Sequence, residues 1–290
     1  MGDISSAVVF RWLASGDAGD LDAFDELLHP DAVIHAPAGL STTSADEADP
    51  ELAAHRVGEL HERRLELAGD RKRGGVYYTP PDVVEHLLDM ALDPILQDCG
   101  DSVDRVRALR VLDPACGSGN FLSAAGDRIR QRLEVLGTPA SQAAAAAFGG
   151  CLVGIDIDPA AVGLCVASLA HASRGTVTEA AMSDQIHCAD TLGLVAAEAA
   201  LLRSFSWQRI KGDVGVPEGF DLVIGNPPFL SQLASETARS EECTARLRQR
   251  FGPSVAGLTD TAVLFLVLAV DAAKSTDGVI CLILSTPPQY

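Results

Sequence analysis

The run of residues with the clearest chemistry is Asn226-Pro227-Pro228-Phe229, which directly follows an apolar stretch. Two consecutive prolines fix the backbone and remove two N–H donors, so nearby carbonyl oxygens are left free to accept hydrogen bonds. The side-chain carbonyl of Asn226 and the backbone carbonyl of Pro227 could accept both hydrogens of a planar amino group, which frees its lone pair for attack on an electrophilic methyl group. Phe229 could stack on the ring that carries the amine. Taken alone, the run is better explained as a proline-rich strand exit without chemistry.

A glycine-containing turn occurs earlier in the chain, in the run LDPACGSGNFL at residues 112–122. Gly117 and Gly119 allow the backbone to turn sharply and to approach a ligand closely. The run lacks a Gly-Lys-Ser/Thr ending, and the carboxylate of Asp113 would repel a phosphate, so it is not a phosphate-binding loop. Asp113 instead suits a positively charged group, such as the amino group of a methionine moiety. A dinucleotide oxidoreductase is excluded, because its Gly-x-Gly-x-x-Gly spacing requires a glycine where Leu122 stands.

Further carboxylates stand at the ends of the next two apolar runs. Asp156 could accept hydrogen bonds from both hydroxyl groups of a ribose, and Asp190 could accept one from an adenine amino group. Asp158 is better placed to cap a helix that begins at Pro159. A single carboxylate at such a point is more often a helix cap than a ligand-binding group. Three of them in successive strand-to-helix turns favour a nucleoside site.

Short apolar runs that each lead into a helical pattern predict the elements that position these residues. The predicted strands span residues 108–112, 151–155, 185–188, 220–224 and 279–284. The apolar spacing predicts helices over 51–68, closed by Gly69, and over 81–96. Strands that alternate with helices predict an α/β fold with a mostly parallel sheet. Ligands of such sheets bind beyond the carboxyl ends of the strands, where the polar residues above stand.

Residues 1–50 have a different character. Two short helices are predicted at 8–14 and 21–28, followed by a brief strand at 33–35 and a polar linker. The stretch FRWLASGDAGDLDAFDELLHPDAVIHAP resembles the opening of SnoaL-like polyketide cyclase domains of the nuclear transport factor 2 type. No further alternating strands follow, so the resemblance implies a fragment or appendage without activity of its own. An unrelated acidic helical extension is nearly as good an interpretation.

The composition excludes several classes of protein. The chain of 290 residues is 47% hydrophobic and has seven scattered cysteines without a Cys-x-x-Cys pair, which argues against a disulfide framework or a zinc site. The N-terminus lacks the pattern of a secretory signal, and the most apolar stretch, residues 262–270, is too short to span a membrane. We therefore expect a cytoplasmic protein that holds no metal and contacts no membrane.

The net charge of −18 is the main argument against a nucleic-acid partner, because phosphate binding normally needs a basic surface. Half of the net negative charge lies in residues 1–50, which hold ten acidic residues and, apart from histidine, the single basic residue Arg11. Basic residues gather in two places, at Arg56, Arg63, Arg64, Arg71, Lys72 and Arg73 and at Arg246, Arg248 and Arg250. Solvated helix faces explain these clusters as well as phosphate contacts do, so charge neither supports nor excludes DNA.

Taken together, the motifs resemble those of DNA adenine-N6 amino-methyltransferases of the gamma arrangement, which include the methylases of restriction–modification and phage-defence enzymes. The resemblance covers residues 51–290, with the motifs in the family's order. Residues 75–80, Gly-Val-Tyr-Tyr-Thr-Pro, resemble the family's N-terminal cofactor motif, and residues 57–62 match the preceding element, with His61 where a tyrosine is usual. Residues 260–271 resemble the segment whose aromatic residue packs on the cofactor adenine. Phe265 is the candidate there, and a buried core phenylalanine is the competing interpretation.

The resemblance implies S-adenosylmethionine as cofactor, DNA as partner and a target adenine that leaves the duplex to reach the site. It implies no metal and no covalent nucleophile. The implied cofactor contacts are Tyr78, Thr79, Pro80, Asp113, Ala115, Cys116, Gly117, Gly119, Asn120, Phe121, Asp156, Ile157, Asp190 and Phe265. The implied catalytic residues are Asn226, Pro227, Pro228 and Phe229.

The resemblance also implies a class I Rossmann-like methyltransferase fold in three parts. These are an acidic appendage over 1–50, a helical part over 51–105 and the catalytic core over 106–290. This fold normally continues with a helix and a final antiparallel hairpin, and the family adds a DNA-reading domain. We therefore expect an unfinished sheet with an exposed edge and a target-recognition domain that is separate or missing. Weak or absent DNA methylation by this chain alone follows from that expectation.

Two other functions fit the same motifs. One is a methyltransferase that acts on a protein glutamine or on RNA, since Asn-Pro-Pro-aromatic serves planar amides and amines in general. Residues 75–80 favour DNA over both. The other is a truncated product that binds the cofactor without catalysis.

Overall fold

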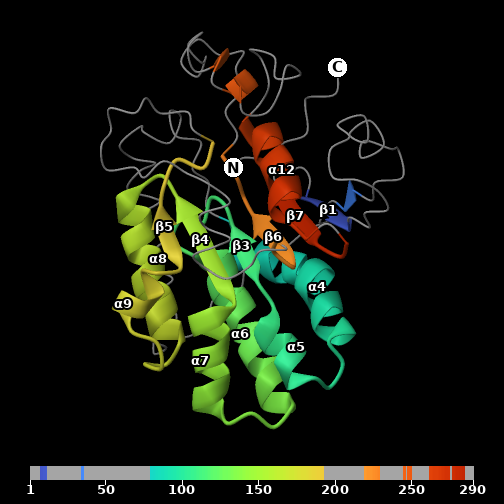
Figure 1. Ribbon diagram of the computed structural model, residues 1–290, viewed down its shortest axis with the longest axis vertical. Helices are drawn as coiled ribbons and strands as arrows, with labels where there is room; N and C mark the ends of the chain where they lie inside the picture. Colours follow the sequence, from blue (N-terminus) through green and yellow to red (C-terminus); the bar gives the residue numbers. More distant parts are fainter. Residues whose placement is uncertain are drawn as a thin grey trace.

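The computed structural model describes residues 7–11, 34–35, 79–192, 219–228, 244–245, 247–249, 261–274 and 276–284. In these residues one sheet has the strand order β2-β1-β7-β6-β3-β4-β5, with helices packed against it (Figure 1). The strands are β1 (Ala7–Arg11), β2 (Ile34–His35), β3 (Val111–Asp113), β4 (Leu152–Asp156), β5 (Ile186–Cys188), β6 (Leu222–Gly225) and β7 (Val279–Ile283). The helices are α4 (Pro81–Asp98), α5 (Val103–Ala108), α6 (Asn120–Val135), α7 (Ala140–Gly150), α8 (Pro159–Ala172), α9 (Glu179–Met182) and α12 (Thr261–Ala272).

The five strands from β3 to β7 run parallel, which confirms the predicted α/β, Rossmann-like fold class. From β3 the chain moves outward through β4 and β5, and it returns on the other side of β3 to form β6 and β7. The order therefore reverses between β3 and β6, and ligands of open α/β sheets bind at such a switch point. Asp113 ends β3 and Asn226 follows β6, so both stand at this position.

The predicted start of the first parallel strand was wrong by three residues. Ala108 ends α5, a short helix whose first turn is capped by Ser102, which accepts a hydrogen bond from the Arg105 backbone N–H. β3 begins only at Val111. Only one residue separates Ala108 and Leu109 from Val111 in the sequence, so the short apolar pattern does not separate the end of α5 from the start of β3.

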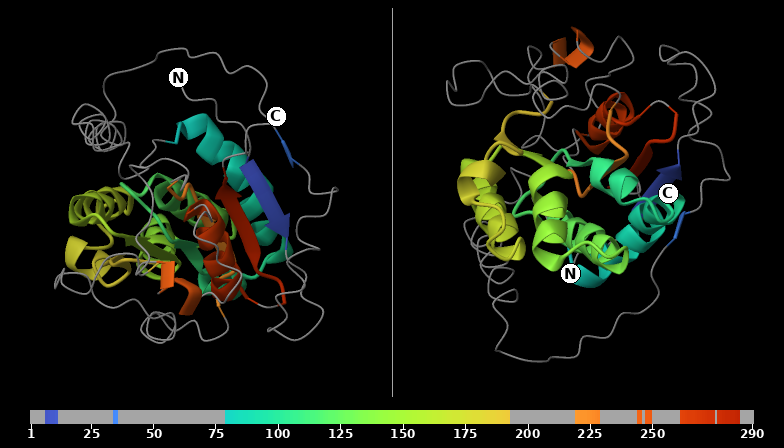
Figure 2. Two further views of the ribbon diagram at one scale, coloured as in Figure 1. Left: turned by 90° about the horizontal axis from the view of Figure 1, so that it is seen from above. Right: turned by 60° about the horizontal axis from the view of Figure 1, so that its bottom comes forward.

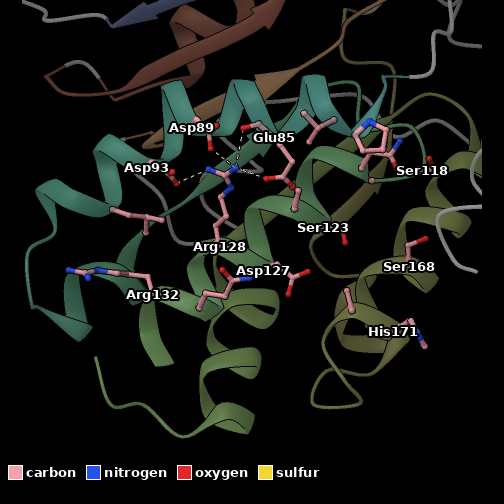
Figure 3. Close-up of a pocket in the computed structure, with 18 of the residues that line it drawn as sticks. Glu85, Asp89, Asp93, Ser118, Ser123, Asp127, Arg128, Arg132, Ser168 and His171 are labelled. Carbon is pink, nitrogen blue, oxygen red and sulfur yellow. Dashed lines mark hydrogen bonds and ion pairs between the residues drawn. The ribbon is translucent and has the colours of Figure 1, made fainter. Parts of the chain in front are cut away.

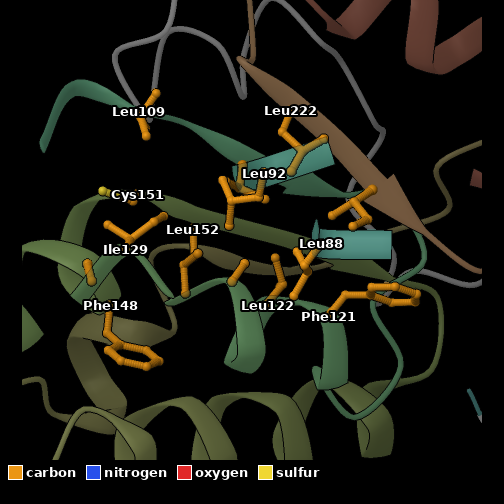
Figure 4. Close-up of a cluster of buried hydrophobic side chains, with 14 of the residues drawn as sticks. Leu88, Leu92, Leu109, Phe121, Leu122, Ile129, Phe148, Cys151, Leu152 and Leu222 are labelled. Atoms are coloured by element: carbon orange, nitrogen blue, oxygen red, sulfur yellow. The ribbon is translucent and has the colours of Figure 1, made fainter. Parts of the chain in front are cut away.

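Alternate side chains of the strands enter two different cores. On one face, Leu222 and Ile224 of β6 pack with residues of α4, α6, α7 and α8 (Figure 4). On the other face, Val223 of β6 and Ile280 of β7 pack against α12. Figure 2 shows α12 and α4 on opposite sides of β7. Because helices cover both faces of the sheet, the parallel strands are mainly apolar along their whole length in the sequence, as is typical of parallel sheets.

Helix α4 is tied to α6 by Arg128, whose guanidinium lies 2.5–2.8 Å from the carboxylates of Glu85, Asp89 and Asp93 (Figure 3). These acids are four residues apart and therefore share one face of α4. Partial burial of Arg128 disfavours its charge, but the three hydrogen-bonded carboxylates outweigh this and raise its pKa. The network holds the start of α4, and with it Thr79 and Pro80, in a defined place relative to the sheet.

The structure overturns two expectations for the N-terminal residues. Residues 8–11, predicted as part of a helix over 8–14, instead lie in strand β1, which pairs antiparallel with all five residues of β7. The predicted strand at 33–35 is confirmed as β2, which pairs with β1. The expected exposed edge beside β7 is therefore occupied by β1. Val8, Val9 and Phe10 favour an extended backbone, and pairing with the open edge of β7 decides the outcome over local helical spacing.

We expect removal of residues 1–11 to destabilise the protein, because β7 would lose its antiparallel partner. Net contributions of about 1 kcal/mol per hydrogen bond predict a loss of a few kcal/mol, and a melting temperature lower by about 5 °C or more. Deletion of residues 1–6, which retains β1, is the matched control. Differential scanning calorimetry and light scattering measure stability and aggregation. Equal behaviour of the two deletions would contradict the role of β1.

Candidate functional site

The two motifs at the switch point touch each other through Asp113 and Gly225. A β-carbon at position 225 would lie 2.6 Å from Oδ1 of Asp113, so no side chain larger than hydrogen fits there. The carboxylate that ends β3 thus lies directly against the backbone that precedes Asn226. The sequence analysis did not single out Gly225. A glycine that ends a strand and immediately precedes the Asn-Pro-Pro run was the available signal.

The turn after β3 is hydrogen-bonded to the end of β4 and to the residues that follow β5. The backbone N–H groups of Cys116 and Gly117 donate to the carbonyl of Ile155 and to Oδ2 of Asp156, at 2.9 and 2.8 Å. The hydroxyl of Thr191, which follows β5, donates to the carbonyl of Pro114 at 3.0 Å. These bonds join three successive strand ends into one surface. Thr191 was also missed, because a threonine after a strand has no distinctive pattern.

The glycines of this turn have the backbone conformations that the sequence analysis expected. Gly117 and Gly119 have φ angles of 53° and 92°, in the left-handed region that favours glycine. A β-carbon on Gly119 would also lie 2.7 Å from Sγ of Cys165. The turn therefore depends on glycine at 119 both for its conformation and for its packing against α8.

Asp156 is half-buried at the end of β4, and both of its carboxylate oxygens accept backbone hydrogen bonds. Oδ2 accepts from Gly117 and Oδ1 from the N–H of Asp158, at 2.8 and 2.9 Å. Burial raises the pKa of Asp156, partly opposed by these bonds. Each oxygen has a second acceptor position, so the group can accept hydrogen bonds from a ligand as well. Asp158 caps α8 through the N–H of Ala160, as predicted.

Asp113 is 1% exposed and accepts one hydrogen bond, from the N–H of Ala115 at 3.0 Å. Burial raises the pKa of Asp113 from 3.8 to about 8, against the lowering effect of the Ala115 bond, and the nearby charge of Asp156 raises it further. Burial therefore favours the protonated form of Asp113 near neutral pH. A cationic group placed beside it would favour the charged carboxylate.

The raised pKa of Asp113 predicts a specific dependence of stability on pH. Between about pH 4 and pH 8 the unfolded chain has released the proton that folded Asp113 keeps, so ionisation favours the unfolded state increasingly as pH rises. Asp113→Asn removes this titration and keeps the acceptor for Ala115. We expect the free energy of unfolding of wild type, relative to this variant, to fall from pH 5 to pH 8 in urea titrations. If the difference in the free energy of unfolding between the two proteins does not change with pH, folded Asp113 is already ionised at pH 5.

Asn226 presents an acceptor without a partner. Its Oδ1 atom is buried and has no hydrogen-bond partner among the residues that the structure describes. Its Nδ2 atom donates to Oγ1 of Thr79 at 3.1 Å. A buried acceptor left unpaired costs about 1–3 kcal/mol, which is tolerated at sites where a ligand supplies the donor. Pro227 is buried and Pro228 is half-buried.

The other residues predicted to contact the cofactor differ in their burial and in their place in the fold. Asp190 is buried just beyond β5, and Ile157, beyond β4, is 45% exposed. Phe265 is 5% exposed and belongs to a small cluster of Leu192, Leu247, Leu264 and Leu268, against which Ala115 packs. It thus has the burial of a core residue while it lies beside the turn. Tyr78 and Phe229 lie outside the described residues, as do residues 51–76. Of the two basic clusters named in the sequence analysis, only Arg248 is described.

Two residues of the turn point away from the site. The side chains of Cys116 and Phe121 are buried in the core between the sheet and α4, α6 and α8. Any contact they make with a ligand would come from their backbone. The apolar core requires a large side chain at the start of α6, which explains Phe121 without reference to a ligand. Asn120 is half-buried and begins α6.

A groove of about 880 Å³ lies elsewhere, over the layer formed by α4, α6 and α8 (Figure 3). It is lined by Glu85, Asp89, Asp93 and Arg128 and reaches the glycine turn only at residues 118–120. Asp113, Asp156 and Asn226 do not line it. We therefore place the candidate site at the strand ends and not in this groove.

Within the described ranges, no group of three or more His, Cys, Asp or Glu side chains is arranged to hold a metal ion. In the same ranges, no helix has both the length and the apolar character needed to cross a membrane.

The chain is similar in sequence and in fold to known proteins. The adenine-specific methyltransferase PglX of Streptomyces coelicolor is 28% identical over 249 residues, which are 77% of this chain and 19% of PglX. The structure is similar to a DrdV–DNA complex, with a TM-score of 0.56, 20% identity and coverage of 81% of this chain and 23% of that one. It is also similar to a nuclease-deletion mutant of the Type ISP restriction-modification enzyme LlaGI, in complex with a DNA substrate mimic, with a TM-score of 0.51, 17% identity and coverage of 71% and 18%.

The structural similarities, at these identities, establish a shared fold. The chain spans about a fifth of the length of the relatives it matches. The model of the N-6 DNA methylase family matches residues 53–285, which include every motif at the strand ends. The chain therefore belongs to the N-6 DNA methylase family.

Proposed function

We propose that this chain binds S-adenosylmethionine at the ends of β3, β4 and β5 and transfers its methyl group to the exocyclic amino group of adenine in DNA. Membership of the N-6 DNA methylase family supports the reaction class. The observation that carries the proposal for this chain is the buried Oδ1 of Asn226, which has no hydrogen-bond partner among the described residues. In the proposed reaction, the amino group of the target adenine would supply the hydrogen-bond donor for this acceptor.

The residues at the strand ends fit S-adenosylmethionine. Asp113 is a buried carboxyl group whose ionisation would be favoured by the cationic amino group of a methionine moiety. Asp156 keeps acceptor positions that suit the two hydroxyl groups of a ribose. The turn between them, with glycines at 117 and 119, allows close approach of a ligand to the backbone.

When bound, the cofactor supplies a methyl group that is already activated on a sulfonium. The chain's own part is to hold the amine. Oδ1 of Asn226 accepts one hydrogen of the adenine amino group, and the carbonyl of Pro227 accepts the other. These bonds draw the nitrogen toward tetrahedral geometry and direct its lone pair away from the ring. Positioning and electrostatics of this kind require neither a metal nor a covalent nucleophile.

We further propose that the target base leaves the duplex to reach Asn226, because enzymes that modify bases cannot reach their target atoms inside the stack. The net charge of −18 by itself gives no indication of a basic surface for phosphates. We propose that sequence recognition and most of the affinity for DNA come from a separate domain or partner chain.

The test is a single-turnover assay with the protein in excess over a short oligonucleotide that contains one unpaired adenine. An unpaired base lowers the cost of flipping, so the assay depends less on DNA-binding elements outside this chain. The donor is S-adenosylmethionine with a deuterated methyl group, and mass spectrometry of the digested DNA identifies the product. We expect labelled N6-methyladenine. Binding of the cofactor by a folded protein that labels cytosine, RNA or protein glutamine instead would contradict the proposed substrate.

A further inference from the structure

The hydrogen bond between Thr79 and Asn226 joins two residues that are 147 positions apart in the chain. Nδ2 of Asn226 donates to Oγ1 of Thr79 at 3.1 Å, and Thr79 is 5% exposed. In the structure this bond places the amide NH₂ group on the hydroxyl and leaves the amide oxygen for a ligand.

We infer that Thr79 is a positioning residue that orients the Asn226 amide, so that its oxygen and not its nitrogen faces the target amino group. This inference rests on the proposed function, because it assigns the orientation a role in holding the adenine amine. It adds to the cofactor contact that the family resemblance implies for Thr79.

The argument begins with the symmetry of an amide. The oxygen and nitrogen of an asparagine side chain have nearly the same size, so hydrogen bonding decides between the two orientations. The Thr79 hydroxyl can accept from Nδ2 or donate to Oδ1, and in the structure it accepts from Nδ2. With Nδ2 on Thr79, Oδ1 is the free atom and can accept from an amine. In the opposite orientation, Nδ2 would face the amine, and two donors would oppose each other. Only the observed orientation can bind the substrate.

Thr79 is well suited to enforce this choice because its position is rigid. It directly precedes Pro80, whose carbonyl accepts from the N–H groups of Val83 and Val84 at the start of α4. Helix α4 is anchored in the core by its apolar face and to α6 by Arg128. Loss of the Thr79 hydroxyl would leave Nδ2 without this partner, and the amide would be free to rotate.

The chain permits a direct measurement, because Asn120 and Asn226 are its only asparagines. Selective ¹⁵N labelling of asparagine therefore gives two side-chain NH₂ signals in an NMR spectrum. The pair that disappears in Asn226→Ala belongs to Asn226, and the Asn120 pair is an internal reference. We compare wild type with Thr79→Val, which has the same shape without a hydroxyl, and with Thr79→Ser, which keeps the hydroxyl.

We expect Thr79→Val to shift the Asn226 NH₂ signals and to speed their exchange with water, while the Asn120 signals stay in place. At saturating cofactor, the same variant should lower the single-turnover rate of methyl transfer about 10-fold, as expected for the loss of one hydrogen bond. Thr79→Ser should restore both the spectrum and most of the rate. A simple loss of packing would not be rescued by the smaller serine.

Three results would overturn the inference. The first is an Asn226 signal that is unchanged in Thr79→Val. The second is a changed signal with an unchanged rate at saturating cofactor. The third is a variant that only weakens cofactor binding, which would leave Thr79 as a cofactor contact alone. If the wild type binds cofactor but methylates no adenine, the proposed function fails, and the spectra still decide whether Thr79 orients the amide.

Discussion

Replacement of Asn226 with alanine is expected to lower single-turnover methyl transfer to adenine by about 10²–10³-fold, the range for removal of one group that stabilises a transition state. The reason is that Oδ1 of Asn226 is a buried acceptor that no described residue pairs with, so its removal takes away the group proposed to receive the amine hydrogen. The carbonyl of Pro227 alone would hold the amine with one bond and leave its orientation undefined. The measurement is the rate of N6-methyladenine formation at saturating cofactor.

The control for this prediction separates chemistry from cofactor binding. Because Asn226 lies beyond β6, away from Asp156 and the end of β4, we expect the dissociation constant for the cofactor to change by less than about threefold, well under 1 kcal/mol. Asn226→Gln is the matched variant, since it keeps the amide and moves it by one methylene group. It should be nearly as slow as Asn226→Ala, because near-attack geometry tolerates little displacement. A rate close to that of wild type in Asn226→Ala would refute the role of this residue.

The second large effect is expected at Asp156, where alanine should weaken binding of S-adenosylmethionine by about 100-fold or more. Hydrogen bonds to a charged group contribute about 1.5–3 kcal/mol each, and Asp156 is proposed to accept two of them from the ribose. We expect the loss of cofactor affinity to be larger still, because Oδ2 of Asp156 also accepts from the N–H of Gly117 and its removal would loosen the turn after β3. Isothermal titration calorimetry on wild type and variant measures the effect directly.

Asp158→Ala is the control for the loss of one negative charge and for local disruption of the fold near Asp156. It removes a carboxylate two residues away that caps α8 through the N–H of Ala160. We expect it to cost about 1 kcal/mol of stability and to leave cofactor affinity within about threefold. Thermal melts establish that Asp156→Ala is folded at the temperature of the titration. Equal affinity of Asp156→Ala and wild type would remove Asp156 from the site.

Much of the candidate site could be predicted from the sequence because its signals are local. A carboxylate or an Asn-Pro-Pro run that follows an apolar stretch of four or five residues must stand at a strand end, since strand and side-chain period are set by neighbouring residues. In a parallel sheet all such ends lie at one edge, so Asp113, Asp156 and Asn226 were predicted to lie together without knowledge of the strand order. The parallel strands and the cap at Asp158 followed from the same local rules.

The N-terminal strand could not be predicted in this way. Residues 7–11 have no partner nearby in the sequence apart from β2, and their state depends on β7, which is more than 260 residues away. Local spacing favoured a helix, and the open edge of β7 overrode it, because a strand edge offers a full row of unpaired hydrogen-bonding groups. The same pairing removed the exposed edge that the sequence analysis expected.

The contacts that define the site in detail also belong to the tertiary structure alone. The residue type shows that Asn226 carries an amide, but only the folded chain shows that its NH₂ group donates to Thr79, which precedes α4. The sequence shows a glycine at 225, but its necessity depends on the carboxylate of Asp113 from another strand. The sequence by itself determined which groups meet at the strand ends, because residue type and strand period are local properties. Only the folded chain decided how those groups are oriented and charged, because orientation and burial depend on atoms that the chain brings together from far apart.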